Sequence, residues 1–299
     1  MTGTGQLWPG PGLVGRAVEV HGSRLAYVEG GAGPTFVFVH GNPTSSFLWR
    51  GVLAGMTGVA HCVAVDLAGM GRSAKPDAAY DWAFHLRSVE GFLDALGFQA
   101  VTYVGHDWGG VLGLELLRRR PDLVGALAVL ECHLDDYPSW AAMPGRSLFE
   151  PIRTTEEGRR QVLANNLMVE QVLPAGMDHQ LSDAEWDIYR EPFRTPAARL
   201  PILRWIEQIP VAGEPPAVAE AVGGNTETLA HGNVPRLLMY GDPGSVVTAA
   251  DAARIRARAD DGLTVTTVGP GTHFLPEDRP AEIAAALRHW SHLSDRSSN

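Results

Sequence analysis

The sequence of 299 residues has little of several features that mark whole classes of protein. No run approaches about 18 consecutive apolar residues, so no transmembrane helix is expected. The two cysteines, Cys62 and Cys132, form no CxxC or CxxxC pair, which argues against a zinc or redox motif and predicts small apolar core residues. Residues 1–15 lack the basic and long apolar segments of a secretory signal and are interpreted as a flexible lead-in. These absences favour a reduced, cytoplasmic setting.

Basic charge is scarce as well. The chain has 24 Lys and Arg residues against 34 Asp and Glu residues, a formal net charge of -10, and its densest basic cluster is only residues 118–120. Because this balance repels phosphate backbones, nucleic acid is not an expected partner. Hydrophobic residues make up 45% and charged residues 19%, which is ordinary for a globular protein with a large core.

Short apolar, β-branched runs alternate with helical stretches, which predicts a mostly parallel sheet with crossover helices. The expected strands are residues 24–29, 35–40, 61–66, 100–105, 126–131, 236–240 and 263–268. The expected helices are residues 47–56, 83–96, 109–119 and 281–293. Between residues 135 and 213 the alternation lapses, with helical pieces at 155–172 and 183–190 and no convincing strand. We interpret that region as an inserted helical subdomain.

Open α/β sheets bind ligands beyond the carboxyl ends of their strands, so catalytic residues are expected directly after the strands. After the strand that ends near residue 105 comes GHDWGG, residues 105–110, which fits the G-x-nucleophile-x-G turn with Asp107 in the place of serine. A carboxylate is ionised near neutral pH and needs no base to attack. Its attack on an sp³ carbon gives an ester and requires a leaving group such as a halide or an epoxide oxygen. The alternative is an aspartate that only caps the following helix.

The turn after the last expected strand, GPGTHF at residues 269–274, places His273 where a general base belongs. A histidine base must be neutral and needs an acceptor for its other ring nitrogen. Two carboxylates could serve. Glu131 ends one strand and Asp242 follows another in a Gly-Asp-Pro-Gly sequence that also suits a plain turn. Reasoning from the residues leaves both open.

The loop HGNPTSS at residues 40–46 follows the second expected strand. Such a loop supplies one backbone N–H to an oxyanion hole, and the residue after the nucleophile, Trp108, supplies the other. The side chains of Asn42 and Trp108 would flank the nucleophile with N–H donors that do not release a proton readily. The pair therefore suits a leaving group that departs as a stable anion, unless Asn42 is a turn residue and Trp108 a core residue. His40 is interpreted as structuring the loop, and His106 as pointing away from the nucleophile's side.

Several motifs together carry a family resemblance. They are HGNPTSSFLWR at residues 40–50, DLAGMGRS at 66–73, GHDWGG at 105–110, YREPF at 189–193, AGEP at 212–215 and GPGTHF at 269–274. From about residue 20 onward the chain strongly resembles the haloalkane dehalogenases. The resemblance implies an α/β-hydrolase fold, in which a mostly parallel central sheet is flanked by helices. Residues 1–133 and 214–299 would form this core, and residues 134–213 an inserted helical cap.

The resemblance also implies roles for single residues. Asp107 would be the nucleophile, His273 the base, and Asn42 with Trp108 the halide-binding pair. The chain looks like the branch in which a glutamate after the sixth strand orients the base, which selects Glu131. A buried apolar pocket would lie beneath the cap, and its candidate lining residues are Phe149, Met168, Val172 and Phe274.

The expected reaction is hydrolysis of a haloalkane to an alcohol, a halide and a proton. It needs no metal and no organic cofactor, and the sequence holds no metal-ligand spacing. The expected partners are a small apolar halogenated substrate, water and the halide, without nucleic acid or membrane, in a monomer or a small homo-oligomer.

The nearest competing function is that of an epoxide hydrolase with the same nucleophile. Such an enzyme would carry an aromatic residue in place of Asn42 and use cap tyrosines such as Tyr137 or Tyr189 to protonate the alkoxide. Three less favoured classes are a fluoroacetate-type dehalogenase, which would carry arginine in place of Trp108, a coelenterazine-type monooxygenase, and a catalytically silent relative that binds an apolar ligand.

Overall fold

The computed structural model describes residues 8–297, and these contain one eight-stranded sheet. The strands are β1 (Leu13–Val20), β2 (Ser23–Gly30), β3 (Thr35–Val39), β4 (His61–Val65), β5 (Val101–His106), β6 (Val124–Leu130), β7 (Arg236–Pro243) and β8 (Leu263–Gly271). Their order is β1-β2-β4-β3-β5-β6-β7-β8. β2 pairs antiparallel with β1 and β4, and the other neighbours are parallel. The predicted α/β-hydrolase fold class is confirmed.

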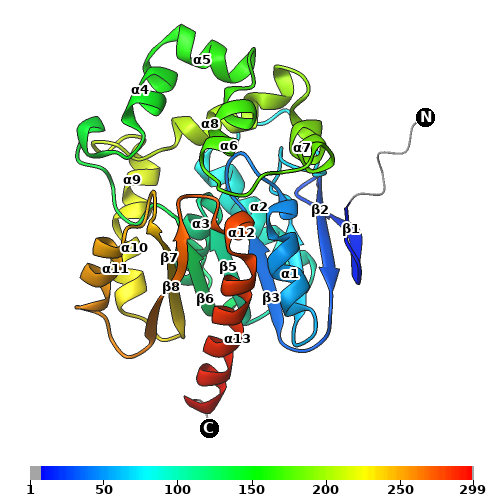
Figure 1. Cartoon of the computed structure of the whole chain (residues 1–299), viewed down its shortest axis with the longest axis vertical. Helices are drawn as coiled ribbons and strands as arrows, with labels where there is room; N and C mark the ends of the chain where they lie inside the picture. Colours follow the sequence, from blue (N-terminus) through cyan, green and yellow to red (C-terminus); the bar gives the residue numbers. More distant parts are fainter. Residues whose placement is uncertain (1–7, 298–299) are drawn as a thin grey trace.

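Helices cover both faces of this sheet (Figure 1). One face packs against α1 (Arg50–Met56) and α13 (Pro280–Ser297), and the other against α2 (Trp82–Ala95), α3 (Trp108–Arg119), α10 (Asn225–Ala230) and α11 (Ala249–Arg256). Successive residues of β3, Val37, Phe38 and Val39, are therefore fully buried. Such continuous burial explains why the central strands read as unbroken apolar runs in the sequence.

A second layer of helices lies over the carboxyl ends of the parallel strands (Figure 1). It consists of α4 (Arg146–Thr154), α5 (Glu156–Leu163), the π-helix η3 (Met168–Val172), α6 (Leu173–Ala175), α7 (Asp183–Arg190) and α8 (Leu200–Glu207), with single 3₁₀ turns at Trp140–Ala142, Glu191–Phe193 and Ala197–Arg199. We call residues 134–213 the cap segment. Outside it, the remaining short helices are η1 (Ser46–Trp49), α9 (Pro216–Gly223) and α12 (Leu275–Asp278).

The two ends of the cap segment meet where it joins the sheet. Tyr137 forms a parallel bridge with Val211, and the Ala212 amide donates to the Tyr137 carbonyl at 2.7 Å. This isolated bridge qualifies the expectation that the region holds no strand pairing. It draws Tyr137 back towards the carboxyl end of β6.

Two sequence expectations are wrong in their bounds. Residues 13–15 belong to β1 and are not part of a flexible lead-in, whereas residues 1–7 lie outside the described residues. β1 is an edge strand with mostly exposed side chains, so it has no apolar alternation to detect. The helix expected over 155–172 stops at Leu163, because Asn166 adopts a φ of 54°, and helical structure resumes at Met168.

Both cysteines are buried and free, as expected for core residues. Within residues 8–297, no helix is long and apolar enough to span a bilayer.

Candidate active site

Asp107 occupies a sharp turn between β5 and α3, with φ 53° and ψ -126°. A residue other than glycine adopts such a φ only at a strained position. The turn needs glycine on both sides, because a Cβ at Gly105 would lie 2.5 Å from the Gly109 carbonyl oxygen and a Cβ at Gly109 would collide with the Val39 carbonyl. The Asp107 side chain makes no cap hydrogen bond to α3. The capping alternative is therefore not supported, and the carboxylate is held above the sheet.

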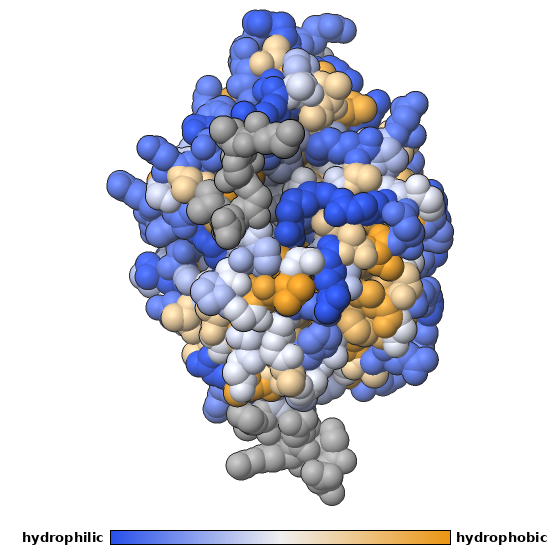
Figure 2. Space-filling model, turned by 90° about the vertical axis from the view of Figure 1, so that its right-hand side faces the viewer, coloured by the Kyte–Doolittle hydropathy of each residue, from blue (hydrophilic) through white to orange (hydrophobic). Residues whose placement is uncertain are grey.

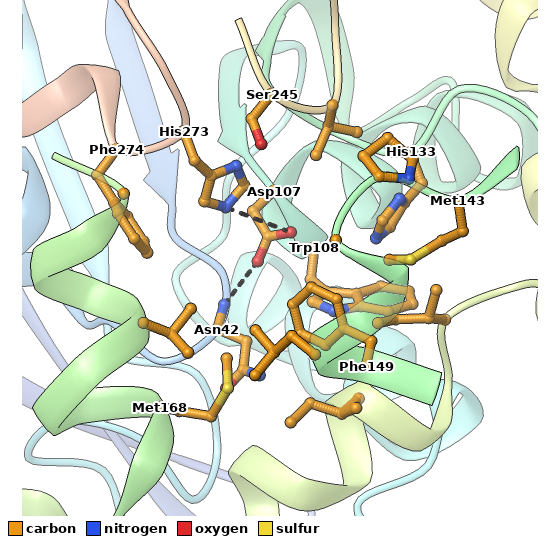
Figure 3. A pocket seen from close by; sticks show the side chains of 18 of the residues that line it. Asn42, Asp107, Trp108, His133, Met143, Phe149, Met168, Ser245, His273 and Phe274 are labelled. Carbon is orange, nitrogen blue, oxygen red and sulfur yellow. Dashed lines mark hydrogen bonds and ion pairs between the residues drawn. The ribbon is translucent and has the colours of Figure 1, made fainter. Parts of the chain in front are cut away.

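Backbone donors surround this carboxylate. Its Oδ2 atom accepts the backbone N–H of Asn42 at 2.7 Å (Figure 3), and the nearby backbone N–H of Trp108 favours the charged form of the carboxylate. Any Cβ at position 41 would overlap the carboxylate, so Gly41 permits this approach. Burial raises the pKa of Asp107, although the charge of His273 and the two backbone donors oppose that rise. Backbone N–H groups beside a carboxylate can stabilise negative charge that develops on it, as in an oxyanion hole.

His273 follows β8 and lies between two carboxylates. Its Nε2 is 4.0 Å from Oδ1 of Asp107, and its Nδ1 is 3.4 Å from Oε2 of Glu131. Burial opposes protonation of the ring, but the hydrogen bond to Glu131 and the charges of Asp107 and Glu131 outweigh it and raise the pKa of His273. The ring is thus aligned between a nucleophile and an acceptor, as a general base requires.

Glu131 is completely buried directly after β6. Its carboxylate accepts the backbone N–H groups of Ser245, Val246 and Val247 at 2.8 to 3.3 Å, in addition to facing His273. These donors compensate for burying a charge and fix the orientation of the carboxylate. Asp242, the other candidate, is exposed, and no hydrogen bond within the described residues joins it to His273. The geometry favours Glu131 as the residue that orients the base.

Asn42 and Trp108 lie on either side of the Asp107 carboxylate (Figure 3). One amide hydrogen of Asn42 is used in a 3.3 Å bond to the Ile202 carbonyl of α8, which leaves its second hydrogen free. The Trp108 indole is stacked on Trp205 of α8 at 4.7 Å between ring centroids, with an interplanar angle of 25°. The cap segment therefore fixes both side chains beside the Asp107 carboxylate.

A cavity of about 250 Å³ lies between the sheet and the cap segment. Its lining includes Asp107, Asn42, Trp108 and His273, together with all four predicted pocket residues, Phe149, Met168, Val172 and Phe274. Three further polar side chains line it that the sequence reasoning did not place there, His133, Tyr137 and Ser245. His133 lies two positions after Glu131, so the rule that sites follow strand ends could have found it. Among the described residues no cluster of acidic, histidine and cysteine side chains could hold a metal ion.

The two remaining histidines near the turn have structural contacts. His40 accepts the Leu67 N–H at 2.9 Å and lies 2.7 Å from the Gly41 carbonyl, and burial lowers its pKa to about 4. This agrees with its interpretation as a loop-structuring residue. His106 is fully buried, and its Nε2 lies 2.8 Å from the His273 carbonyl, so it supports the backbone of the base.

The chain is similar to known proteins over most of its length. The chain matches the family model of the alpha/beta hydrolase fold over residues 34–280. It is 38% identical over 278 residues to a haloalkane dehalogenase of Mesorhizobium japonicum, covering 91% of this chain and 89% of the relative. It is 39% identical over 280 residues to a haloalkane dehalogenase of Sphingobium indicum, covering 90% and 92%.

Among solved structures, the haloalkane dehalogenase DbeA from Bradyrhizobium elkani superposes with a TM-score of 0.91 at 35% identity, over 95% of this chain and 99% of that one. The family model and the sheet topology define an α/β-hydrolase, with Asp107 at the sharp turn after β5. The similarity to haloalkane dehalogenases over nearly the whole chain identifies one family within this class. The protein belongs to the haloalkane dehalogenase family.

Proposed function

We propose that this protein hydrolyses haloalkanes to an alcohol, a halide ion and a proton through a covalent alkyl-aspartate intermediate. The observation that carries the proposal is the setting of Asp107. Its carboxylate is held in an oxyanion hole at the floor of a largely apolar cavity, with the N–H donors of Asn42 and Trp108 beside it.

In the first step the Oδ1 atom of Asp107 attacks the carbon that bears the halogen. Oδ2 is engaged by the Asn42 amide, so Oδ1 is the oxygen left to form the bond. The carbon–halogen bond breaks as the carbon–Oδ1 bond forms, and the halide takes the bonding electrons. The Asn42 amide and the Trp108 indole stabilise this anion, and no proton has to be supplied.

In the second step His273 removes a proton from a water molecule that attacks Cγ of the ester. Negative charge then develops on Oδ2, which already accepts the backbone N–H of Asn42, and the backbone N–H of Trp108 beside the carboxylate stabilises it further. Glu131 stabilises the imidazolium formed on His273. The Cγ–Oδ1 bond breaks and the alcohol leaves with the proton from His273. The carboxyl group of Asp107, which now carries the second hydrogen of the water, releases that proton to solvent and becomes a carboxylate again.

Residues 134–213 act in this proposal as a cap, distinct from the core of residues 1–133 and 214–299. The cap excludes water from the first step and supplies most of the apolar wall, including Phe149, Met168 and Val172, while Phe274 comes from the core. The cytoplasmic location and the oligomeric state stay predictions from the sequence.

Epoxide hydrolysis is less well supported. It needs an acid that protonates the departing alkoxide, and the sequence offered Tyr137 and Tyr189. Tyr189 does not line the cavity, and its hydroxyl donates to Glu277. Tyr137 lines the cavity, but its hydroxyl is hydrogen-bonded to His133. Asn42 and Trp108 instead provide donors suited to a halide.

The test is free bromide released from 1-bromobutane and 1,2-dibromoethane by the purified protein, with Asp107→Ala run beside it. Release by the parent and none by the variant is the expected result. No release by either protein would contradict the proposal, and epoxides would then be tried as substrates. Release by both proteins would contradict the assignment of Asp107.

A further inference from the structure

The side chains of His133 and Tyr137 line the cavity but have no part in the mechanism above. His133 is buried, lies at the carboxyl end of β6, and presents its ring to Trp108 at 5.2 Å between centroids and an interplanar angle of 66°. Tyr137 packs edge-on against His133 at 5.7 Å. Figure 3 shows His133 beside Trp108, on the opposite side of Asp107 from Phe274. His133 therefore lines the same cavity as Asp107, beside the Trp108 ring.

Tyr137 determines which nitrogen of His133 carries the proton. Burial lowers the pKa of His133 to about 3 and raises the pKa of Tyr137, so both side chains are neutral at physiological pH. The Tyr137 hydroxyl lies 3.0 Å from Nδ1 of His133, and within residues 8–297 it has no other hydrogen-bond partner. We infer that the hydroxyl donates to Nδ1, because its hydrogen has no other acceptor among the described residues. In a neutral imidazole the proton then resides on Nε2.

The Nε2–H group of His133 is open to the cavity. No hydrogen bond among the described residues engages Nε2. This atom is not among the buried side-chain nitrogen and oxygen atoms that lack a hydrogen-bond partner, so it is not sealed off from the cavity. His133 itself lines the cavity. An N–H donor that faces an apolar cavity is costly when substrate excludes water without offering an acceptor.

The surroundings decide what kind of acceptor suits this donor. No lysine or arginine lines the cavity within the described residues, and the Asp107 carboxylate repels an anion. A neutral acceptor avoids that repulsion and leaves the apolar contacts of the rest of the molecule in place. An ether oxygen that replaces one methylene group meets these conditions with almost no change of shape.

We propose that His133, with its tautomer fixed by Tyr137, is a specificity-determining residue that favours haloalkanes carrying an ether oxygen near the reacting carbon. The inference rests on the proposed dehalogenation and adds a substrate class to it. Removing the donor should affect the ether more than the alkane of the same shape, whereas a residue that only packs against Trp108 would affect both alike.

The experiment measures kcat/KM for bromide release with isosteric pairs. One pair is 1-bromo-2-methoxyethane and 1-bromobutane, and the other is 1-bromo-3-methoxypropane and 1-bromopentane, which moves the oxygen by one position. The quantity compared is kcat/KM for the ether divided by kcat/KM for the alkane of the same pair. The pair with the larger ratio shows at which chain position the oxygen meets the donor. In His133→Phe this ratio should fall at least about fivefold relative to the parent protein, the size expected for one lost hydrogen bond.

Two further variants separate the donor from its surroundings. Tyr137→Phe should lower the ratio in the same direction but less, because Nδ1 can then carry the proton and Nε2 ceases to be a fixed donor. Ser245→Ala removes a different hydroxyl from the same cavity and should leave the ratio within about twofold. Thermal unfolding of each variant checks that the fold is retained.

The outcomes distinguish the two proposals. If the parent releases bromide from 1-bromobutane and the ratio is the same in His133→Phe for both pairs, the ether preference is wrong and dehalogenation stands. If Ser245→Ala changes the ratio and His133→Phe does not, the donor has been assigned to the wrong residue. If the parent releases bromide from neither member of a pair, the proposed function fails and the ether preference fails with it.

Discussion

An aspartate in place of serine changes when the histidine is needed. In the proposed mechanism Asp107 attacks without a base, so His273 acts only after the halide has left. The two steps also present different charges to His273. In the free protein Asp107 is an anion 4.0 Å from Nε2, and in the ester intermediate that charge is gone. The same residue therefore has a different proton affinity in each state.

This difference predicts a shift of pKa between the two states. In the free protein burial opposes protonation of His273, but Glu131 and the Asp107 charge raise its pKa above the ordinary value of about 6.5. Esterification removes the Asp107 contribution, so the pKa of His273 should be lower in the intermediate. The base is lost as pH falls through that lower value. NMR titration of the free protein, set against the pH profile of ester hydrolysis in single turnovers, measures both, and equal values would refute this account.

Replacing His273 by phenylalanine should stop the reaction after its first step. Alkylation needs only Asp107, so one bromide should be released per protein molecule, followed by turnover slower by about 10³-fold. The intact mass should rise by one alkyl group. Continued multiple turnover without accumulation of that adduct would sink the assignment of the base.

The choice of Glu131 over Asp242 is tested by a matched pair of amide substitutions. Glu131→Gln removes the charge that faces Nδ1 of His273 and places an amide among three backbone N–H donors, so kcat should fall by about 100-fold or more. Asp242→Asn makes the same change at an exposed site and should alter kcat by less than about twofold. A larger effect at position 242 than at 131 would reverse the assignment.

At the scale of the elements, the cap segment contacts a buried ion pair of the core through the side chains of Glu185 and Tyr189. Arg50 of α1 donates to Glu277 of α12 at 2.6 Å and to Glu185 of α7 at 2.8 Å, and Tyr189 of α7 also donates to Glu277. The Glu277 side chain is only 1% exposed, whereas that of Glu185 is 28% exposed. The two carboxylates should therefore depend on Arg50 to very different degrees.

Arg50→Met leaves Glu277 buried without its cation and should lower the free energy of unfolding by about 3 kcal/mol. Glu185→Gln removes only a partly exposed partner and should lower it by no more than about 1 kcal/mol. Adding Glu277→Gln to Arg50→Met should restore part of the loss, since the uncompensated charge is then gone. Urea unfolding measures all three, and equal losses for the two single variants would contradict the burial argument.

The elements that were predicted from the sequence are those whose own residues carry the signal. The central strands are buried on both faces, and α7 shows its start through a capping box of Ser182 and Glu185. β1 was not predicted, because an exposed edge strand has no periodic apolar face. The break at Asn166 depends on one backbone angle, which an otherwise helical composition does not reveal.

The site residues also differ in whether the sequence alone could predict them. Asp107, His273, Asn42 and Trp108 follow strand ends and could be placed from motif and order. The pairing of His133 with Tyr137 could not, because it depends on where the cap segment turns back. The bridge between Tyr137 and Val211 joins residues far apart in the sequence and brings the tyrosine over His133. Contacts of that kind follow from the packing of two layers and leave no trace in local sequence.

At the scale of the whole molecule, the cavity is a product of both layers. The sheet and its loops supply the reactive floor, and the cap segment supplies much of the apolar wall, so neither alone sets how long a substrate can be accommodated. Each methylene buried in such a cavity contributes about 0.8 kcal/mol, or roughly fourfold in affinity. For 1-bromoalkanes of increasing length, kcat/KM should therefore rise at each step until the chain fills the cavity, and then level off.

The chain length of bromoalkane at which kcat/KM levels off tests whether this cavity holds the substrate. Phe149→Ala opens the cap wall and should move the plateau to longer bromoalkanes. Phe98→Ala removes the same ring where it packs against His61, away from the cavity, and should leave the plateau where it was. Bromide release across the series, measured as kcat/KM for the three proteins, gives the result. A plateau that Phe149→Ala does not move would mean that substrates lie elsewhere than between the sheet and the cap segment.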